Sequence, residues 1–280
     1  MPLRSVLLLP PLLAAMSLPL PARAQAPPST RLVLDRAGAL VARYLDELAR
    51  LVARESMTQH AAPTGDGTGA VAGPGRQWVA EMAWVALPGE AEALAVRDVV
   101  EVDGVAVRGA GSRLVRLLHG PGPGDWATAR AILDEGARHN LAPGSRNFNL
   151  PTVALFFLHP ERRARFSWTR RSPARDAVWE LDFRERQRPT IVRGVRGEQV
   201  YSRGRVWIEA DSGVVRRTRL HLTLDPVVYT LDTTFDHVPE VALVLPTRLD
   251  ERYAAPDRVV VSTATYGAYR RFQTGARLMR

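Results

Sequence analysis

Residues 207–220 read WIEADSGVVRRTRL, which is two runs of strand-forming residues around an Asp-Ser-Gly turn. Gly213 supplies the permissive backbone and Asp211 the side chain that a short hairpin loop needs. After the turn, residues alternate with period two between an apolar row (Thr218, Leu220, Leu222, Leu224) and a polar row (Arg217, Arg219, His221, Thr223, Asp225). The pattern predicts a strand with one buried face. We therefore expect the arginines beside this turn to be solvated, not to converge on one anion.

Segments of the same kind follow one another from residue 165 to residue 274, separated by Gly, Pro, Asp and Asn. This spacing is typical of an antiparallel meander. Because strand twist accumulates across a long sheet, we expect the sheet to bend. The predicted fold class is α+β: a strongly curved antiparallel β-sheet, a half-barrel of roughly 9–11 strands, with helices covering the concave face.

The chain before the meander begins with an amphipathic pattern. Apolar residues recur at three- and four-residue spacing over 34–54, with arginines on the opposite side, so we expect a helix there. A helix packed on the sheet is the favoured interpretation, and a helix lying on a membrane is the alternative. Residues 60–77, rich in Gly, Pro and Ala, predict a flexible loop.

Early strands are expected over 77–108, with Asp103 and Gly104 at a tight turn, and a helical inset over 111–160. The inset ends in NLPTVALFFLHP, whose apolar residues suggest a short helix buried almost all round. A docking surface for a partner is the alternative for this segment. Residues 25–280 are predicted to form a single α+β domain.

The first 24 residues have the features of a secretory signal peptide, namely Arg4, an apolar run, and small residues at Ala22 and Ala24. We expect cleavage near Ala24. A membrane anchor is the alternative, but prolines interrupt a run already short for about 30 Å of hydrocarbon. The absence of cysteine excludes a lipid-modified cysteine, disulfides and thiolate metal sites. The mature protein is therefore expected to be periplasmic or secreted.

The chain is basic, with a net charge of +9, and all of its basic residues are arginines. Removal of the leader takes away Arg4 and Arg23 and leaves +7. This charge predicts solubility and some attraction to anionic envelope surfaces. Nucleic acid is not expected as a partner, because the arginines are mixed with 29 acidic residues and do not form a block.

Motifs for catalysis are not found in the sequence. It has no H-E-x-x-H motif, no G-x-S-x-G elbow and no phosphate-binding loop of the P-loop or Rossmann type. A metal site built from His221 with Asp232 or Asp236 remains an alternative to ordinary polar residues on a strand face. We expect no catalytic residues, no metal and no cofactor, and the favoured interpretation is a protein without enzymatic activity.

Aromatic and leucine side chains in the predicted strands are the more informative set. Those on the concave side either fill the core beneath the helices or line a cavity for an apolar ligand. The volume and lining of any cavity between the leading helix and the sheet would decide between the two. The candidate ligand-binding residues are Trp84, Trp168, Trp179, Phe183, Trp207, Leu220, Leu222, Tyr229 and Phe235.

The order of these parts resembles the half-barrel of outer-membrane lipoprotein carriers, in which helices cover an incomplete barrel around an apolar cavity. The phrases RDVVEVDGVAVR, ARHNL, NLPTVALFFLHP and YRRF are also similar to those of a group of uncharacterised secreted proteins of soil bacteria. The carrier resemblance covers mainly the strands and implies non-covalent binding of acyl chains, without catalysis. No motif in the chain matches the functional residues of the carriers.

The expected function is that of a non-enzymatic periplasmic protein that binds a hydrophobic or lipid-like ligand. The partners expected are a lipid or acyl-chain ligand and peripheral contact with a membrane. An interaction or regulatory scaffold for an envelope protein is the alternative. An envelope hydrolase is a third, because a nucleophile and a base can be assembled from distant residues.

Overall fold

The computed structural model describes residues 27–64, 75–85, 94–119, 125–141, 151–194 and 196–272. The expected signal peptide, residues 1–24, lies outside the described residues. The expected loop over 60–77 is shorter than predicted, because its first and last residues belong to strands, and residues 65–74 lie outside the described part.

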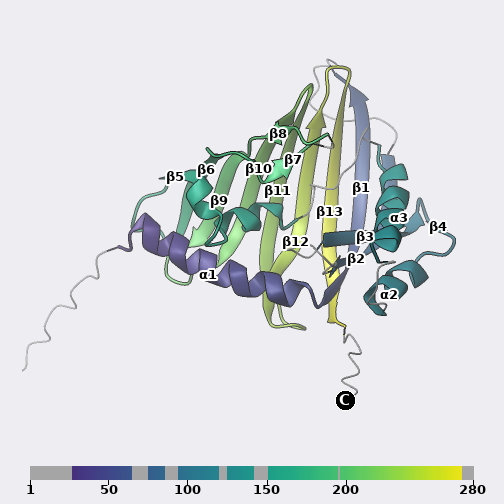
Figure 1. Cartoon of the computed structure of the whole chain (residues 1–280), viewed down its shortest axis with the longest axis horizontal. Coiled ribbons are helices and arrows are strands. Elements are labelled where there is room, and N and C mark those ends of the chain that lie inside the picture. The colour runs from purple at the N-terminus through teal and green to yellow at the C-terminus, as the bar shows by residue number, and fades with distance from the viewer. Residues whose placement is uncertain are drawn as a thin grey trace, which may run out of the picture.

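One large antiparallel sheet dominates the structure (Figure 1). Its strands are β1 (Leu51–Pro63), β2 (Gly75–Val85), β3 (Leu94–Val102), β4 (Val105–Ala106), β5 (Phe166–Arg170), β6 (Val178–Glu185), β9 (Arg203–Glu209), β10 (Val215–Leu224), β11 (Val227–Val238), β12 (Leu243–Ala254) and β13 (Arg258–Arg271). A separate small hairpin consists of β7 (Val192–Arg193) and β8 (Gln199–Val200). The helices are α1 (Thr30–Leu48), α2 (Ser112–His119) and α3 (Asp125–Arg138), with the 3₁₀ helices η1 (Val153–Leu158) and η2 (Arg163–Arg165). The prediction of an α+β fold with a long meander is confirmed.

The sheet is continuous across both ends of the chain. Its 11 strands lie in the order β4-β3-β2-β1-β13-β12-β11-β10-β9-β6-β5. Strand β1 pairs with β13 along its length, from Leu51 opposite Arg271 to Pro63 opposite Arg258. The early strands and the meander are thus joined by main-chain hydrogen bonds between segments that lie far apart in the sequence.

The expected strong curvature is not observed. The sheet is open, with β4 and β5 at its two edges, and it is not closed or strongly curled (Figure 1). Edge strands are a liability when they are long, but β4 has two residues and β5 has five. Short edges and covering helices protect the sheet without a barrel-like bend, so half-barrel geometry was the wrong expectation.

The leading helix begins earlier and ends earlier than predicted. Ser29 caps it, accepting a hydrogen bond from the Leu32 amide at 3.2 Å, and α1 ends at Leu48 instead of Arg54. Leu51 and Val52, which continue the apolar pattern of the helix, belong to β1. Both pair with β13, and Val52 also pairs with β2. Two adjacent apolar residues fit a helix and a buried strand equally well, so periodicity did not separate the two.

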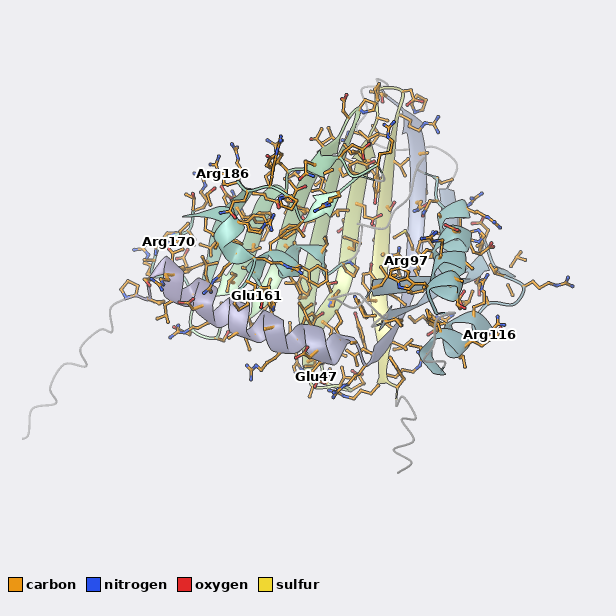
Figure 2. The ribbon with its side chains drawn as sticks, viewed as in Figure 1. Glu47, Arg97, Arg116, Glu161, Arg170 and Arg186 are labelled. Carbon is orange, nitrogen blue, oxygen red and sulfur yellow. The ribbon has the colours of Figure 1, made fainter. Side chains whose placement is uncertain are left out.

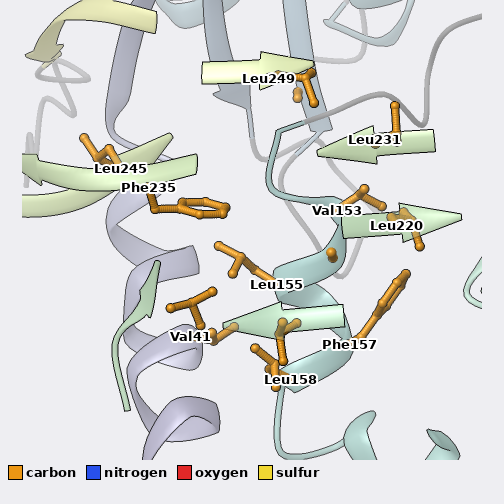
Figure 3. Close-up of a cluster of buried hydrophobic side chains, with 14 of the residues drawn as sticks. Val41, Val153, Leu155, Phe157, Leu158, Leu220, Leu231, Phe235, Leu245 and Leu249 are labelled. Carbon is orange, nitrogen blue, oxygen red and sulfur yellow. The ribbon is translucent and has the colours of Figure 1, made fainter. Parts of the chain in front are cut away.

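One face of the sheet, here called the inner face, carries the main hydrophobic core. The alternation predicted for β10 and β11 places Leu220, Leu231 and Phe235 on it, all nearly fully buried (Figure 3). Helix α1 and η1 cover this face over the strands from β9 to β12 (Figure 1). Residues 153–158 of η1 are buried except for Phe156, as expected of a short helix that is buried almost all round.

Helices α2 and α3 build a second, smaller core. Their buried residues Leu114, Leu117 and Ile132 pack with Val52 of β1 and Val96 of β3. The residues next to Val52 and Val96 in these strands point to the inner face, so Val52 and Val96 point to the other face. The strands at this end of the sheet are therefore covered on both faces. The Asp103-Gly104 turn joins β3 to β4 with positive φ at both residues, 49° and 80°, as the sequence predicted.

Two glycines let α1 approach its neighbours closely. A Cβ atom on Gly213, in the β9–β10 turn, would lie 2.7 Å from the Ala37 amide nitrogen of α1. A Cβ atom on Gly38 of α1 would lie 2.8 Å from the Leu158 carbonyl oxygen of η1. The Arg36 side chain also donates to the Ala210 carbonyl at 2.8 Å. Helix α1 is thus seated by backbone-to-backbone contact that larger residues would prevent.

Replacing Gly213 by alanine should therefore unseat α1. Gly213 has φ of +81° and Gly197 has +83°, but nothing lies within 4 Å of a Cβ atom at Gly197. Gly197→Ala should lower the unfolding free energy by about 1 kcal/mol, the cost of positive φ, and Gly213→Ala by roughly 2–4 kcal/mol because of the added clash. Urea unfolding of both variants measures the difference. Equal losses would contradict the close contact with α1.

Candidate functional site

A groove with mainly apolar lining lies beside α1. Its walls come from α1, η1, the β9–β10 turn, β11 and the start of β12, and its volume is about 640 Å³. We call it the α1 groove. The residues that line it are Leu40, Val41, Arg43, Tyr44, Asp46, Glu47, Arg50, Leu155, Gly213, Val214, Val215, Phe235, His237, Ala242, Leu243 and Val244.

The floor of the α1 groove is apolar because of strand parity. Phe235 points to the inner face with Tyr229 and Leu231, its odd-numbered neighbours in β11, and only 2% of its surface is exposed. Leu155 of η1 and Val41 of α1 lie against the same space, and Figure 3 shows both beside Phe235. A pocket of this size and lining suits a ligand with a long apolar part.

Tyr44 forms part of the wall but contributes no hydrogen bond. Its hydroxyl is buried and has no partner among the described residues. Burial raises the pKa of Tyr44 well above its usual value, so the phenol stays neutral. By contrast, the hydroxyl of nearby Tyr269 donates to the Pro246 carbonyl at 2.6 Å. The wall at Tyr44 therefore presents a neutral phenol to the groove.

Charges of both signs surround the rim of the groove. Glu47, labelled in Figure 2 at the end of α1, forms an ion pair with Arg271 and lies 3.9 Å from Arg50. The hydrogen bond and the charge of Arg271 lower the pKa of Glu47, so its carboxylate is charged at neutral pH. Arg43 is exposed and has no ion-pair partner in the described part of the chain. The rim therefore offers a free guanidinium near an apolar floor.

The residues predicted from the sequence are mostly in the core. The inner-face core includes Trp84, Trp179, Phe183, Leu220, Leu222, Tyr229 and Phe235, and Trp168 packs against it. Phe235 lines the α1 groove. The sequence did not assign the rest of the wall, because Tyr44, Leu155 and Ala242 come from a helix, a 3₁₀ helix and a turn. The apolar stripe of α1 predicted that one side of the helix is covered. It did not predict which residues of η1, β11 and β12 lie beside that stripe.

Trp207 lies on the opposite face of the sheet, here called the outer face. Its neighbours Val206 and Ile208 point into the core, whereas Trp207 stacks with arginines. The guanidinium carbons of Arg217 and Arg219 lie 4.8 and 5.9 Å from its ring centroid. Trp207 therefore does not face a cavity beneath α1, and it shields the aliphatic stems of a charged surface.

The arginines of the β9–β10 hairpin are neutralised by carboxylates. Arg217 binds Asp232 through two hydrogen bonds of 2.6 and 2.7 Å, and Arg219 adds one of 2.7 Å. Arg216 binds Glu209 instead, at 2.7 Å. The prediction that these three arginines do not converge on one anion is confirmed.

A buried ion pair joins the strands at the other end of the inner face. Arg97 of β3, labelled beside α3 in Figure 2, donates to Glu55 of β1 through two hydrogen bonds, one of 2.8 Å. The Tyr266 hydroxyl of β13 donates to the same carboxylate at 2.7 Å, and Trp78 packs under the guanidinium at 5.3 Å. Burial and Glu55 raise the pKa of Tyr266. The Glu55 carboxylate is thus fully bonded, and it fastens three strands.

Neither a metal site nor a spanning helix is found in the part of the chain that the structure describes. No three His, Asp or Glu side chains gather there in a way that holds a metal ion. His221 instead contacts Thr230, at 3.1 Å between Nδ1 and the hydroxyl oxygen, and Asp232 binds arginines. No described helix is long and apolar enough to cross a membrane.

Comparisons with known proteins add little to this geometry. No protein-family model and no curated protein matches the chain. Among solved structures, the chain is similar to a DUF1329 family protein from Desulfovibrio piger, with 12% identity and a TM-score of 0.36 over 89% of this chain and 94% of that one. A likeness of this degree carries no argument about function, and it gives the lipoprotein carrier resemblance no support.

Removal of the Tyr44 hydroxyl should not destabilise the protein. Because that hydroxyl has no partner, Tyr44→Phe should leave the unfolding free energy unchanged or raise it by about 1 kcal/mol. Tyr269→Phe removes a buried hydrogen bond and should lower it by about 1 kcal/mol. Thermal and urea unfolding compare the two variants. A clear loss of stability in Tyr44→Phe would show that its hydroxyl is bonded.

The buried ion pair should be far more sensitive to substitution than an exposed one. Glu55→Gln leaves Arg97 buried without its counter-charge and should cost about 3–5 kcal/mol of unfolding free energy. The control Asp257→Asn breaks an exposed pair with Arg258 and should cost less than about 1 kcal/mol. Urea unfolding at neutral pH measures both. Similar small losses would mean that the Glu55 network does not hold the strands together.

Proposed function

We propose that the protein is exported and binds one acyl chain or similar apolar ligand non-covalently in the α1 groove. The observation that carries this proposal is the groove itself, about 640 Å³ of mainly apolar lining between the leading helix and the sheet. Its volume lies within the range of ligand pockets, about 300–1,000 Å³. The leader-like first residues of the sequence support export.

The chemistry of the lining supports an apolar ligand. Each methylene group that moves from water to the floor formed by Phe235 and Leu155 contributes about 0.8 kcal/mol before the costs of binding. The Arg43 guanidinium at the rim is suited to a carboxylate or another anionic head group of such a ligand. A fatty acid therefore matches both the floor and the rim.

Most of the other candidate residues predicted from the sequence lie in the core, and Trp207 lies on the outer face. Trp84, Trp179 and Leu220 are almost fully buried, so these side chains make up a packed core beneath α1 and η1. The groove lies beside that core and is not a continuation of it. The proposal therefore concerns a groove at the surface of the molecule.

Filling the groove should abolish binding. Val244 lines it and is partly exposed, so Val244→Trp adds bulk to the groove without opening the core. Val228 of β11 is 42% exposed and does not line the groove, which makes Val228→Trp a matched control. With a fluorescent long-chain fatty acid and delipidated protein, we expect the affinity of Val244→Trp to fall about tenfold or more, a loss of about 1.4 kcal/mol.

Solvent extraction of the purified protein, followed by mass spectrometry, provides the complementary test. We expect the wild-type extract to contain fatty acids or lipids in near-stoichiometric amount, and the Val244→Trp extract to contain much less. Equal fluorescent-probe affinity in Val244→Trp and Val228→Trp, together with ligand-free extracts, would contradict the proposed function.

A further inference from the structure

The outer face carries a row of basic side chains with no carboxylate in it. The register of the sheet aligns one residue from each of six neighbouring strands, β5, β6, β9, β10, β11 and β12. These residues are Ser167, Arg184, Arg203, His221, Thr230 and Arg252. We call them the basic row.

The next row along the same strands is different, because it is neutralised. There, Asp182 binds Arg171 and Arg205, and Asp232 binds Arg217 and Arg219. In this row Arg205 lies opposite Arg219, and Asp232 lies opposite Asp250, but each arginine also binds a carboxylate of a neighbouring strand. The basic row therefore differs from the neighbouring row of the same face, in which carboxylates neutralise the arginines.

Arg184 and Arg203 stand directly opposite each other on β6 and β9. Both are exposed, and neither has an ion-pair partner in the described part of the chain. Like charges in direct cross-strand opposition destabilise a sheet. Two unpaired arginines in this arrangement are therefore costly to the fold, and an anion bound between them would remove the cost.

The side chains beside these arginines are arranged to bind the same ligand. Arg186, labelled in Figure 2 near the β5–β6 end of the sheet, donates through Nε to the Ser167 hydroxyl at 3.1 Å. Arg184, Arg186, Arg203 and His221 all line one cleft of about 560 Å³ on the outer face. Asp182 also lines the cleft, but it binds Arg171 and Arg205. Arg184, Arg186 and Arg203 have no carboxylate partner in the part of the chain that the structure describes.

The pKa of His221 is lowered in this cleft by partial burial and by neighbouring positive charges. Partial burial is the largest cause that lowers its pKa, and the neighbouring Arg203 and Arg219 lower it further, against the opposite effect of Asp232. The imidazole is therefore neutral at pH 7 and available as a hydrogen-bonding group. A negatively charged ligand would be attracted by the field that disfavours the imidazolium.

We propose that the basic row binds a phosphoryl group, using Arg184 and Arg203 from neighbouring strands together with Arg186. Neighbouring strands lie about 4.8 Å apart, so two guanidinium groups reach one phosphoryl group and donate to it in the forked geometry that arginine favours. The ligand class is a phosphate monoester, a phosphodiester head group or a pyrophosphate. The site lies on the face opposite α1 and does not depend on the α1 groove.

The test compares the double variant Arg184→Gln/Arg203→Gln with a charge-matched control. Arg138→Gln/Arg258→Gln removes the same charge from exposed arginines that lie outside the cleft and pair with Glu135 and Asp257. Because Arg184 and Arg203 repel each other, their removal should not lower the midpoint of thermal unfolding. A retained midpoint shows that any loss of binding does not come from unfolding.

Two probes separate the sources of the phosphoryl group. Inorganic pyrophosphate, followed by calorimetry at low salt, represents a soluble ligand, and vesicles of phosphatidylglycerol against vesicles of phosphatidylcholine, followed by co-sedimentation, represent a head group. We expect wild-type binding to at least one probe, weakened about tenfold or more in the Arg184/Arg203 variant and unchanged or only slightly weakened in the control. Binding to vesicles alone would assign a lipid head group, and binding to pyrophosphate would assign a soluble phosphoryl ligand. No binding to either probe, or equal losses in the two double variants, would overturn the proposal.

Discussion

The close seating of α1 is the constraint on which the rest of the structure depends. Gly213 and Gly38 bring the helix backbone against the β9–β10 turn and η1, at distances that a Cβ atom would violate. An ion pair between Asp35 and Arg163 and a hydrogen bond from Arg36 hold the same end of the helix. If α1 lay farther away, the inner face would lose its cover and the groove would lose one wall.

The two faces of the sheet differ in chemical character: the inner face is mainly apolar and the outer face is charged. On the inner face, buried aliphatic and aromatic side chains meet helices, and the buried Glu55 forms an ion pair with Arg97. The outer face carries arginines whose stems lie over Trp207 or whose heads bind carboxylates. Each proposed site is a local departure from its face: an apolar groove that packing leaves open, and a basic row that no carboxylate neutralises.

Strand parity was the part of this arrangement that the sequence predicted well. Period-two alternation is a local property, so Leu220, Leu222, Tyr229 and Phe235 were assigned to the correct face without knowledge of their neighbours. Parity was ambiguous in Val206, Trp207 and Ile208, where three apolar residues follow one another, and only contacts with arginines from β10 placed Trp207 outside. The pairing of β1 with β13 joins the two ends of the chain, and no local pattern predicts such a contact. The basic row likewise became visible only through the register of strands that are distant in sequence, and the groove only through the seating of α1.

The central claim is that α1 and the sheet together hold an apolar ligand. Hydrogen–deuterium exchange of delipidated protein, with and without a long-chain fatty acid, tests it most directly. The account predicts slower exchange in α1 (Thr30–Leu48) and around the β11–β12 turn on addition of the fatty acid, with no change in β5 and β6. Unchanged exchange in α1, or protection confined to β5 and β6, would contradict it.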